Sequence, residues 1–208
     1  MSSKIDSIDK KVAEPDVLER GLTIENIVAT LDLGNEYDLM ALSEYLSNSE
    51  YEPETHPFLV HRPQSMQGTV LIPTNGKVSL VGLKNKSNLR ELGSYIIDEL
   101  SQITDGGMPD SSTIEVQNIV LQGDINHELE LPPIVVLLGM ENAEYEPEQF
   151  PGVIYKPDDG TTILIFGSGK FMVNGATTYQ QAVSSISDLF NIFAEAEVPG
   201  DFEDFEMK

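Results

Sequence analysis

The chain is 208 residues long, which fits one large or two small domains, and its apolar content of 40% is enough for a hydrophobic core. It has no cysteine, which excludes disulfides, thiol nucleophiles and cysteine-based zinc sites. Acidic residues outnumber Lys and Arg by 35 to 12, so the net charge of −23 has the wrong sign for binding nucleic acid through phosphate neutralisation. No stretch approaches the roughly 18 consecutive apolar residues that span a membrane, and the N-terminus lacks a signal-peptide pattern, so we expect a soluble cytoplasmic protein without membrane contact.

The acidic composition has two interpretations. In one, the protein simply avoids nucleic acid. In the other, the acidic surface is an adaptation to molar salt, where a Debye length of about 3 Å limits repulsion between carboxylates to very short range. Salt at that level also suppresses affinity that comes from counterion release. A nucleic-acid binder working there would depend on apolar contact and shape.

The first half of the chain is expected to start with a tail and continue as alternating strands and helices. Residues 1–21 show no sustained periodicity and are predicted to be a mobile N-terminal tail. In a first strand over Thr23–Leu31, alternation places Ile24, Asn26 and Val28 on one face. The other elements predicted for this first repeat, residues 22–104, are a helix over Tyr37–Leu46, strands over Phe58–His61, Val70–Ile72 and Val78–Val81, and a helix over Asn88–Ile103.

The second half is predicted to repeat this order after a linker. Residues 105–112 are rich in Gly, Asp, Ser and Pro, which favours a linker there. The second repeat covers residues 113–193, and residues 194–208 are expected to form an acidic, disordered tail. The elements predicted in it are a strand over Ile114–Gln122, a short element near Leu131–Leu138, strands over Val153–Tyr155, Ile163–Phe166 and Phe171–Asn174, and a helix over Tyr179–Phe193.

The two halves are related by an internal duplication. The segment Asn48–Arg62 (NSEYEPETHPFLVHR) is identical to Asn142–Lys156 (NAEYEPEQFPGVIYK) at 7 of 15 positions. TVLIPTNGKVSLVG then aligns with TTILIFGSGKFMVNG, and IENIV aligns with VQNIV, at offsets of 92 to 94 residues. One unit is therefore used twice. Its order of strand, short helix, antiparallel strands and long helix predicts an α+β fold with two pseudo-symmetric repeats.

The motifs QNIV, EYEPEQFPGVIY and LIFGSGK resemble the repeats of the TATA-binding protein family, and the resemblance covers roughly Leu22–Phe193. It implies one curved antiparallel sheet, a saddle, with four helices on the convex face and DNA beneath the concave face. It also implies a general transcription initiation factor that binds A·T-rich, TATA-like double-stranded promoter DNA as a monomer. Such a factor bends the DNA and recruits transcription factor B and, indirectly, RNA polymerase. The acidity then favours an archaeal, halophilic version associated with the nucleoid.

In the resembling family, two Phe side chains per repeat insert between base steps in the minor groove and kink the duplex. The second repeat supplies both, as Phe150 and Phe166. The first repeat has His56 and Pro73 at the aligned positions, where His could stack weakly and Pro could still act as a wedge. The alternative for the Phe pair is ordinary core packing.

Asn26 and Asn118 occupy matching positions in the two first strands of the repeats. An amide at these positions suits the acceptors that A·T pairs present in the minor groove, whereas the alternative is an Asn that caps a turn at a strand edge. The uncovered face of the sheet is expected to be apolar, which marks a binding surface. The other DNA contacts expected are the apolar Val28, Leu71, Val81, Val120, Leu164 and Met172, together with Asn174 and the basic Arg62, Lys77, Lys84, Lys156 and Lys170.

The turn before the second-repeat wedge is implied by the resemblance to dock transcription factor B. It retains Glu146 and Glu148, followed by Gln149, and Pro147 stiffens it. The alternative is that these carboxylates are two more solvated acids. Family repeats have Thr where Val81 and Asn174 stand, and basic residues where Thr55 and Gln149 stand. These departures leave open a divergent paralogue that binds protein partners with little or no DNA bending.

A catalytic interpretation has little support in the sequence. Three histidines are present, His56, His61 and His127, and none is spaced as a metal ligand. The run Gly167–Lys170 (GSGK) lacks the first glycine and the Ser/Thr of a phosphate-binding loop, so it predicts a hairpin turn. We therefore expect no enzyme, no metal site and no cofactor.

Overall fold

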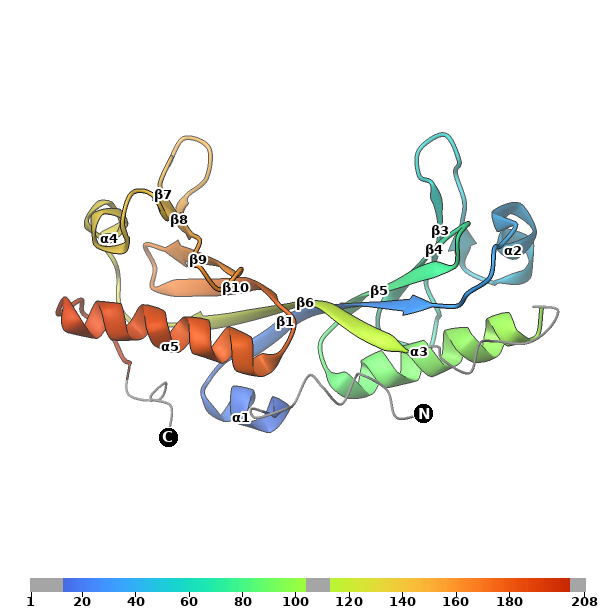
Figure 1. The fold of residues 1–208 in the computed structure, drawn as a ribbon, viewed down its shortest axis with the longest axis horizontal. Coiled ribbons are helices and arrows are strands. Elements are labelled where there is room, and N and C mark those ends of the chain that lie inside the picture. Colours follow the sequence, from blue (N-terminus) through green and yellow to red (C-terminus); the bar gives the residue numbers. More distant parts are fainter. Residues whose placement is uncertain (1–12, 104–112, 203–208) are drawn as a thin grey trace. The chain divides into compact units, whose positions relative to one another are not determined.

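The computed structural model describes residues 13–103 and 113–202, drawn as a coloured ribbon in Figure 1. Contacts divide the chain into two compact units. Among the described residues, unit 1 takes those from Asn26 to Gln117, and unit 2 takes the others. The strands β1 (Thr23–Asp32) and β6 (Ile114–Asp124) each contribute residues to both units.

Unit 1 is an antiparallel sheet with two helices. Its strands follow the hydrogen-bonded order β2-β3-β4-β5-β1, and the first residues of β6 continue this order. There Gln117 Nε2 donates to Thr30 Oγ1 at 2.9 Å. The elements that complete the unit are α2 (Leu39–Tyr45), β2 (Ser49–Glu50), β3 (Phe58–His61), β4 (Thr69–Pro73), β5 (Lys77–Leu83) and α3 (Lys86–Ser101).

Side-chain caps start the two helices of unit 1. Asp38 accepts from the backbone N–H groups of Met40 and Ala41 at 3.0 and 3.2 Å, which starts α2. Asn85 accepts from Asn88 N at 2.7 Å, so α3 begins two residues before the periodicity alone predicts. Helix α3 then packs along one face of the sheet (Figure 1). Its fully buried side chains are Leu89, Leu92, Ile96 and Leu100.

Unit 2 has the same architecture with one additional helix. Its strands follow the order β6-β10-β9-β8-β7, beside the first residues of β1. The long helix packs on β10, where the Phe171 and Phe190 rings meet edge to face at 5.3 Å. The elements are α1 (Glu14–Glu19), α4 (Leu131–Leu138), β7 (Ala143–Glu144), β8 (Gly152–Tyr155), β9 (Thr162–Phe166), β10 (Lys170–Ala176) and α5 (Tyr179–Glu195).

The predicted α+β class, with antiparallel strands in two repeats, is confirmed. The described residues form five helices, however, because part of the expected N-terminal tail is helical. Asp16 Oδ2 accepts from Ala13 N at 2.7 Å to start α1, and Val17 is fully buried. Residues 1–12 of that tail and residues 104–112, which include the predicted linker, lie outside the described residues.

Two further expectations need correction. Ile24 is 3% exposed and lies with the core, not with Asn26 and Val28, because the simple alternation of β1 breaks between Glu25 and Asn26. The expected acidic tail also has structure up to residue 202. Helix α5 runs to Glu195, and the Phe202 ring lies 5.1 Å from that of Phe190. Residues 203–208 lie outside the described residues.

Candidate nucleic-acid interface

In unit 1, the sheet has an open face opposite α3, on which the predicted DNA-contacting side chains lie. Along β1, Ile27, Ala29 and Leu31 are fully buried, whereas Asn26, Val28 and Thr30 are partly exposed. The same alternation along β4 and β5 leaves three more of the predicted residues partly exposed, namely Leu71, Pro73 and Val81. The predicted apolar surface is therefore present in this unit.

Unit 2 has a matching open face, opposite α5. Leu164 on β9 and Met172 on β10 are partly exposed and face each other across the ladder, and Asn174 pairs with Thr162 two residues further on. Val120 was expected on the uncovered face of the sheet, but it is only 8% exposed and contributes little accessible surface there.

Asn26 and Asn118 have the same structural role in the two units. Asn26 Oδ1 accepts from Gly82 N at 3.0 Å, and Asn118 Oδ1 accepts from Gly175 N at 2.7 Å. Both glycines have positive φ, of 78° and 90°, a conformation that other residues adopt only with strain. Each amide is thereby held in one orientation, and its Nδ2 group is the end that carries the hydrogen-bond donors.

The predicted wedge pair of unit 2 is assembled from two adjacent strands. Phe150 precedes β8 and Phe166 ends β9, and their ring centroids lie 5.7 Å apart at an interplanar angle of 58°. Both rings are partly exposed. Gly152 lies beneath them, where an added Cβ would come within 3.0 Å of atoms of both rings. The absent side chain therefore leaves room for the aromatic pair.

The matching site of unit 1 has a different composition. His56 is exposed, and Pro73 ends β4 at the position that aligns with Phe166. A residue that the sequence reasoning missed, Phe58, stacks on His56 with centroids 5.3 Å apart and an interplanar angle of 13°. The aligned segments contained a signal, because Phe58 stands where the second repeat has Gly152.

The predicted phosphate contacts are not equivalent. Arg62 forms an ion pair with Glu50, with Nη1 and Oε2 3.1 Å apart, so part of its charge is already compensated. Both partners are exposed, so the pair contributes little to stability. The exposed lysines lie near strand ends and are Lys77, Lys84, Lys156 and Lys170.

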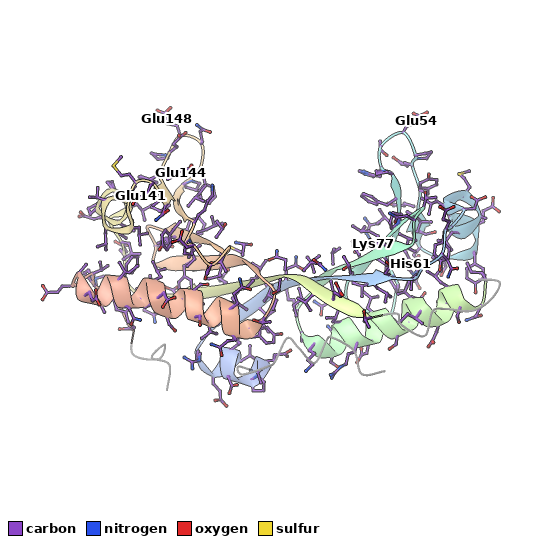
Figure 2. The ribbon with its side chains drawn as sticks, viewed as in Figure 1. Glu54, His61, Lys77, Glu141, Glu144 and Glu148 are labelled. Carbon is purple, nitrogen blue, oxygen red and sulfur yellow. The ribbon has the colours of Figure 1, made fainter. Side chains whose placement is uncertain are left out.

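The acidic turn between β7 and β8 leads directly into Phe150, one of the two predicted wedge residues of unit 2. Gln149 N and Phe150 N both donate to Glu146 O at 2.9 Å, and Gln149 Nε2 donates to Glu146 Oε2. Glu148 lies at the tip of this turn, with its side chain directed outward (Figure 2). Glu54 holds the same place in the β2–β3 turn of unit 1 (Figure 2). The predicted partner-docking residues are therefore exposed on a short, hydrogen-bonded turn.

One buried titratable group distinguishes unit 1. His61 on β3 is 1% exposed, and its Nε2 lies 3.1 Å from the Tyr95 hydroxyl. Burial lowers the pKa of His61, although the nearby Glu99 carboxylate opposes this effect. Because it is buried, His61 belongs to the interior of unit 1 and not to its open face. Tyr155 has the corresponding place in β8 of unit 2.

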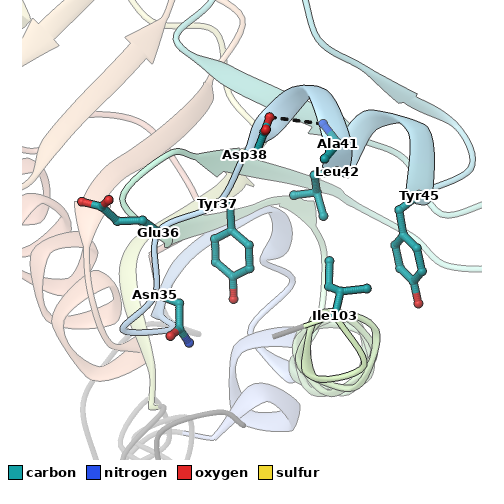
Figure 3. A pocket seen from close by; sticks show the side chains of 8 residues that line it. All are labelled: Asn35, Glu36, Tyr37, Asp38, Ala41, Leu42, Tyr45 and Ile103. Atoms are coloured by element: carbon teal, nitrogen blue, oxygen red, sulfur yellow. Dashed lines mark hydrogen bonds between the residues drawn. The ribbon is translucent and has the colours of Figure 1, made fainter. Parts of the chain in front are cut away.

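Unit 1 also has a cavity of about 390 Å³ between α2 and the residues that follow α3, shown in Figure 3. Its lining includes the apolar Leu42 and Ile103, the aromatic Tyr37 and Tyr45, and the acidic Glu36 and Asp38. Within residues 13–103 and 113–202, no cluster of three or more metal-ligating side chains is present. In the same ranges, no helix is both long enough and apolar enough to cross a bilayer.

Comparison with known proteins identifies the family. A family model described as "Transcription factor TFIID (or TATA-binding protein, TBP)" matches residues 21–103 and, a second time, residues 113–196. The chain belongs to the TATA-binding protein family. The two separate matches agree with the internal duplication, and they cover the predicted wedge positions and the Asn–Gly pair of each unit.

Several relatives within the TATA-binding protein family span nearly the same length. The TATA-box-binding protein of Thermoplasma acidophilum is 43% identical over 169 residues, which are 79% of this chain and 91% of that protein. TATA-box-binding protein E of Halobacterium salinarum is 37% identical over 169 residues, covering 81% of this chain and 90% of its own. The solved structure titled "Methanococcus jannaschii TBP" gives a TM-score of 0.73 at 35% identity, covering 84% of this chain and 98% of that one. The predicted family is confirmed, and relatives from Halobacterium and Haloferax agree with an archaeal, halophilic type.

Proposed function

We propose that this member of the TATA-binding protein family is a general transcription initiation factor that binds A·T-rich, TATA-like promoter DNA through the minor groove and bends it. It acts as a monomer on the nucleoid in the cytoplasm, and recruits transcription factor B and, through that factor, RNA polymerase. The observation that carries the proposal is the Phe150–Phe166 pair, which is held above Gly152 at the margin of an apolar strand face.

Aromatic side chains at this position have a direct physical use. Minor-groove proteins, TATA-binding protein among them, insert apolar side chains between base steps, and the kinked duplex then contacts more protein surface. The open face behind the wedge is lined by side chains such as Leu164 and Met172, which follow the groove without requiring charge. Asn118 Nδ2 supplies a donor for adenine N3 or thymine O2.

The negative charge is compatible with such a mode of binding in molar salt. At a net charge of −23, long-range attraction to phosphate is absent, and few exposed lysines lie near the open faces. Affinity must then come from apolar burial and from DNA deformability, which salt weakens far less than it weakens phosphate contacts. We therefore expect binding to persist at high salt, in contrast with a protein that depends on Lys and Arg.

DNA bending in molar potassium chloride tests this function. A TATA-like duplex labelled at both ends for fluorescence energy transfer should shorten its end-to-end distance when the protein is added. A duplex of the same composition with a scrambled site is the control. An unchanged transfer efficiency at protein concentrations that saturate binding would contradict the proposal.

A second function has one specific observation in its favour. Unit 1 has no Phe at either family wedge position, since His56 and Pro73 stand there. A divergent paralogue could therefore retain the β7–β8 turn as a docking surface and sequester transcription factor B without bending DNA. The same assay separates the two functions, because a paralogue of this kind would bind the partner and leave the transfer efficiency unchanged.

A further inference from the structure

The strand pairing places an aromatic residue at each wedge site, but from different strands. In unit 1, Phe58 on β3 is paired with Pro73 on β4. In unit 2, the corresponding ladder pairs Gly152 on β8 with Phe166 on β9. In unit 1 the aromatic residue of the pair therefore lies on β3, the first strand of the ladder. In unit 2 it lies on β9, the second strand of the equivalent ladder.

This exchange has a steric reason in unit 2. A Cβ at Gly152 would lie 3.0 Å from Phe166 Cδ1, 3.0 Å from Phe150 Cε1 and 2.9 Å from Ile165 O. The ring of Phe166 thus leans over the partner position and occupies the space of a side chain there. In unit 1 the residue at the Phe166 position is Pro73, whose small ring leaves the opposite position open to Phe58.

Phe58 also faces the correct side of its sheet. Along β3, Leu59 and His61 are buried, whereas Phe58 and Val60 are partly exposed. The open face of unit 1 therefore includes Phe58. His56 stacks on its ring at 5.3 Å and nearly in parallel, which limits the orientations that the ring can adopt.

We propose that Phe58, supported by His56, is the base-stacking wedge of unit 1, in place of the two positions that the family alignment designates. This proposal rests on the minor-groove function proposed above. Phe58 supplies the flat apolar surface that unstacks a base step, and Pro73 makes room for it.

Alanine substitutions in unit 1 measure each contribution. Phe58→Ala should weaken binding to a TATA-like duplex roughly tenfold to a hundredfold, the range expected when one base loses its aromatic stacking partner. It should also remove the fluorescence increase of a 2-aminopurine placed at the contacted step. Pro73→Ala should change both readouts less than twofold, and His56→Ala should have an intermediate effect. Phe58→Leu keeps an apolar side chain at a partly exposed position, so it retains the fold if Phe58→Ala does not.

An exchange of the pair gives a sharper test. Phe58→Gly alone should lose binding, and Phe58→Gly combined with Pro73→Phe should recover most of it, because it recreates the Gly152–Phe166 arrangement. Recovery of binding and of the 2-aminopurine signal supports the wedge. If Phe58→Gly acted only through a packing defect, adding Pro73→Phe would not restore the fluorescence of the DNA-bound complex.

Phe166→Ala serves as the reference variant. If Phe166→Ala weakens binding and a folded Phe58→Ala variant does not, the wedge assignment in unit 1 is overturned while the DNA-binding function stands. If neither Phe166→Ala nor Phe58→Ala changes binding or bending, the proposed function itself fails, and this inference fails with it.

Discussion

The two units share one framework and differ at partly exposed positions on the margins of their strands. The backbone devices are preserved, since each unit has an Asn that holds a positive-φ glycine, at 3.0 Å in unit 1 and at 2.7 Å in unit 2. The side chains at the strand margins have changed, from Gly152 and Phe166 in unit 2 to Phe58 and Pro73 in unit 1. The Asn–Gly pairs are thus the same in both units, whereas the two facing residues at the strand margins differ together.

The largest expected effect concerns the partner and tests whether the two acidic turns are equivalent. Glu146→Arg with Glu148→Arg should abolish formation of the ternary complex with transcription factor B, because reversing two charges in an interface costs several kcal/mol. Binding to DNA alone should persist. A gel-shift titration at matched salt, with and without the partner, measures both.

The matched control is the same reversal in unit 1, Glu52→Arg with Glu54→Arg, which changes the net charge equally. It should leave the ternary complex intact. A supershift that survives the unit 2 reversal, or is lost equally in both variants, would show that the β7–β8 turn is not the specific docking site.

The next effect concerns the wedge pair of unit 2. The double variant Phe150→Ala with Phe166→Ala should lose about 2–6 kcal/mol of DNA-binding free energy, because each aromatic that stacks on a base contributes about 1–3 kcal/mol. Fluorescence anisotropy with a labelled duplex gives the change in Kd. His56→Ala with Pro73→Ala is the control in unit 1, and equal losses in the two double variants would mean that the aligned positions still act alike.

A smaller effect is expected at the Asn–Gly pairs, where the units are most similar. Asn118→Ala should lose on the order of 1–3 kcal/mol of DNA-binding free energy, the scale of one mismatched base pair. Asn118→Asp separates the two roles of the residue, because the carboxylate can still accept from Gly175 N but has no donor for the groove. An Asn118→Asp variant with an unchanged thermal midpoint and weaker DNA binding would identify Asn118 Nδ2 as the group that contacts the bases. Unchanged DNA binding by Asn118→Asp would contradict this role.

The smallest expected effect is on acid stability and arises from His61, which corresponds to Tyr155 of unit 2. Burial holds the pKa of His61 below its value in the unfolded chain, about 6.5, while Glu99 opposes the shift and the Tyr95 hydroxyl faces the ring. Protonation therefore favours the unfolded state. The stability contributed by neutral His61 is complete above about pH 6.5 and is lost as the pH falls from there towards the lower pKa of the folded state.

His61→Tyr, which introduces the residue found at the corresponding position of unit 2, should remove this loss of folding stability at mildly acidic pH. Between pH 8 and pH 5.5 the thermal midpoint of the unmodified protein should fall further than that of the variant. Calorimetry at both pH values is the measurement. His56→Tyr, at an exposed position, is the control, and an equal change in both variants would exclude His61 as the origin.

The sequence alone predicted most of the framework, because strand alternation and helical spacing are local signals. The predicted strand over Phe58–His61 and the element over Leu131–Leu138 agree with β3 and α4 residue for residue. The start of α3 was placed two residues late, because a cap such as Asn85 is a single polar side chain outside the apolar period.

Other features depend on contacts between distant residues and left no local pattern. Helix α1 has only six residues, and Val17 is buried through packing with α5, which no periodicity reveals. The proposed role of Phe58 depends on its partner across the ladder and on the stacked His56. Alignment of the repeats places His56 and Pro73 at the family wedge positions. The same alignment sets Phe58 against Gly152, but it does not show that these two residues lie across the ladder from Pro73 and Phe166.

The segment that follows α5 has a consequence for the order in which unit 2 opens. Asp201 N donates to Ile125 O at 3.0 Å, and the Phe202 ring lies 6.1 Å from that of Phe193 and near Phe190. The Asp201–Ile125 hydrogen bond joins the end of the described chain to the residue that follows β6, so forming it requires closure of a long loop. Amide hydrogen exchange at Asp201 would then report the first sub-global opening of unit 2, before the strands beneath α5 lose protection.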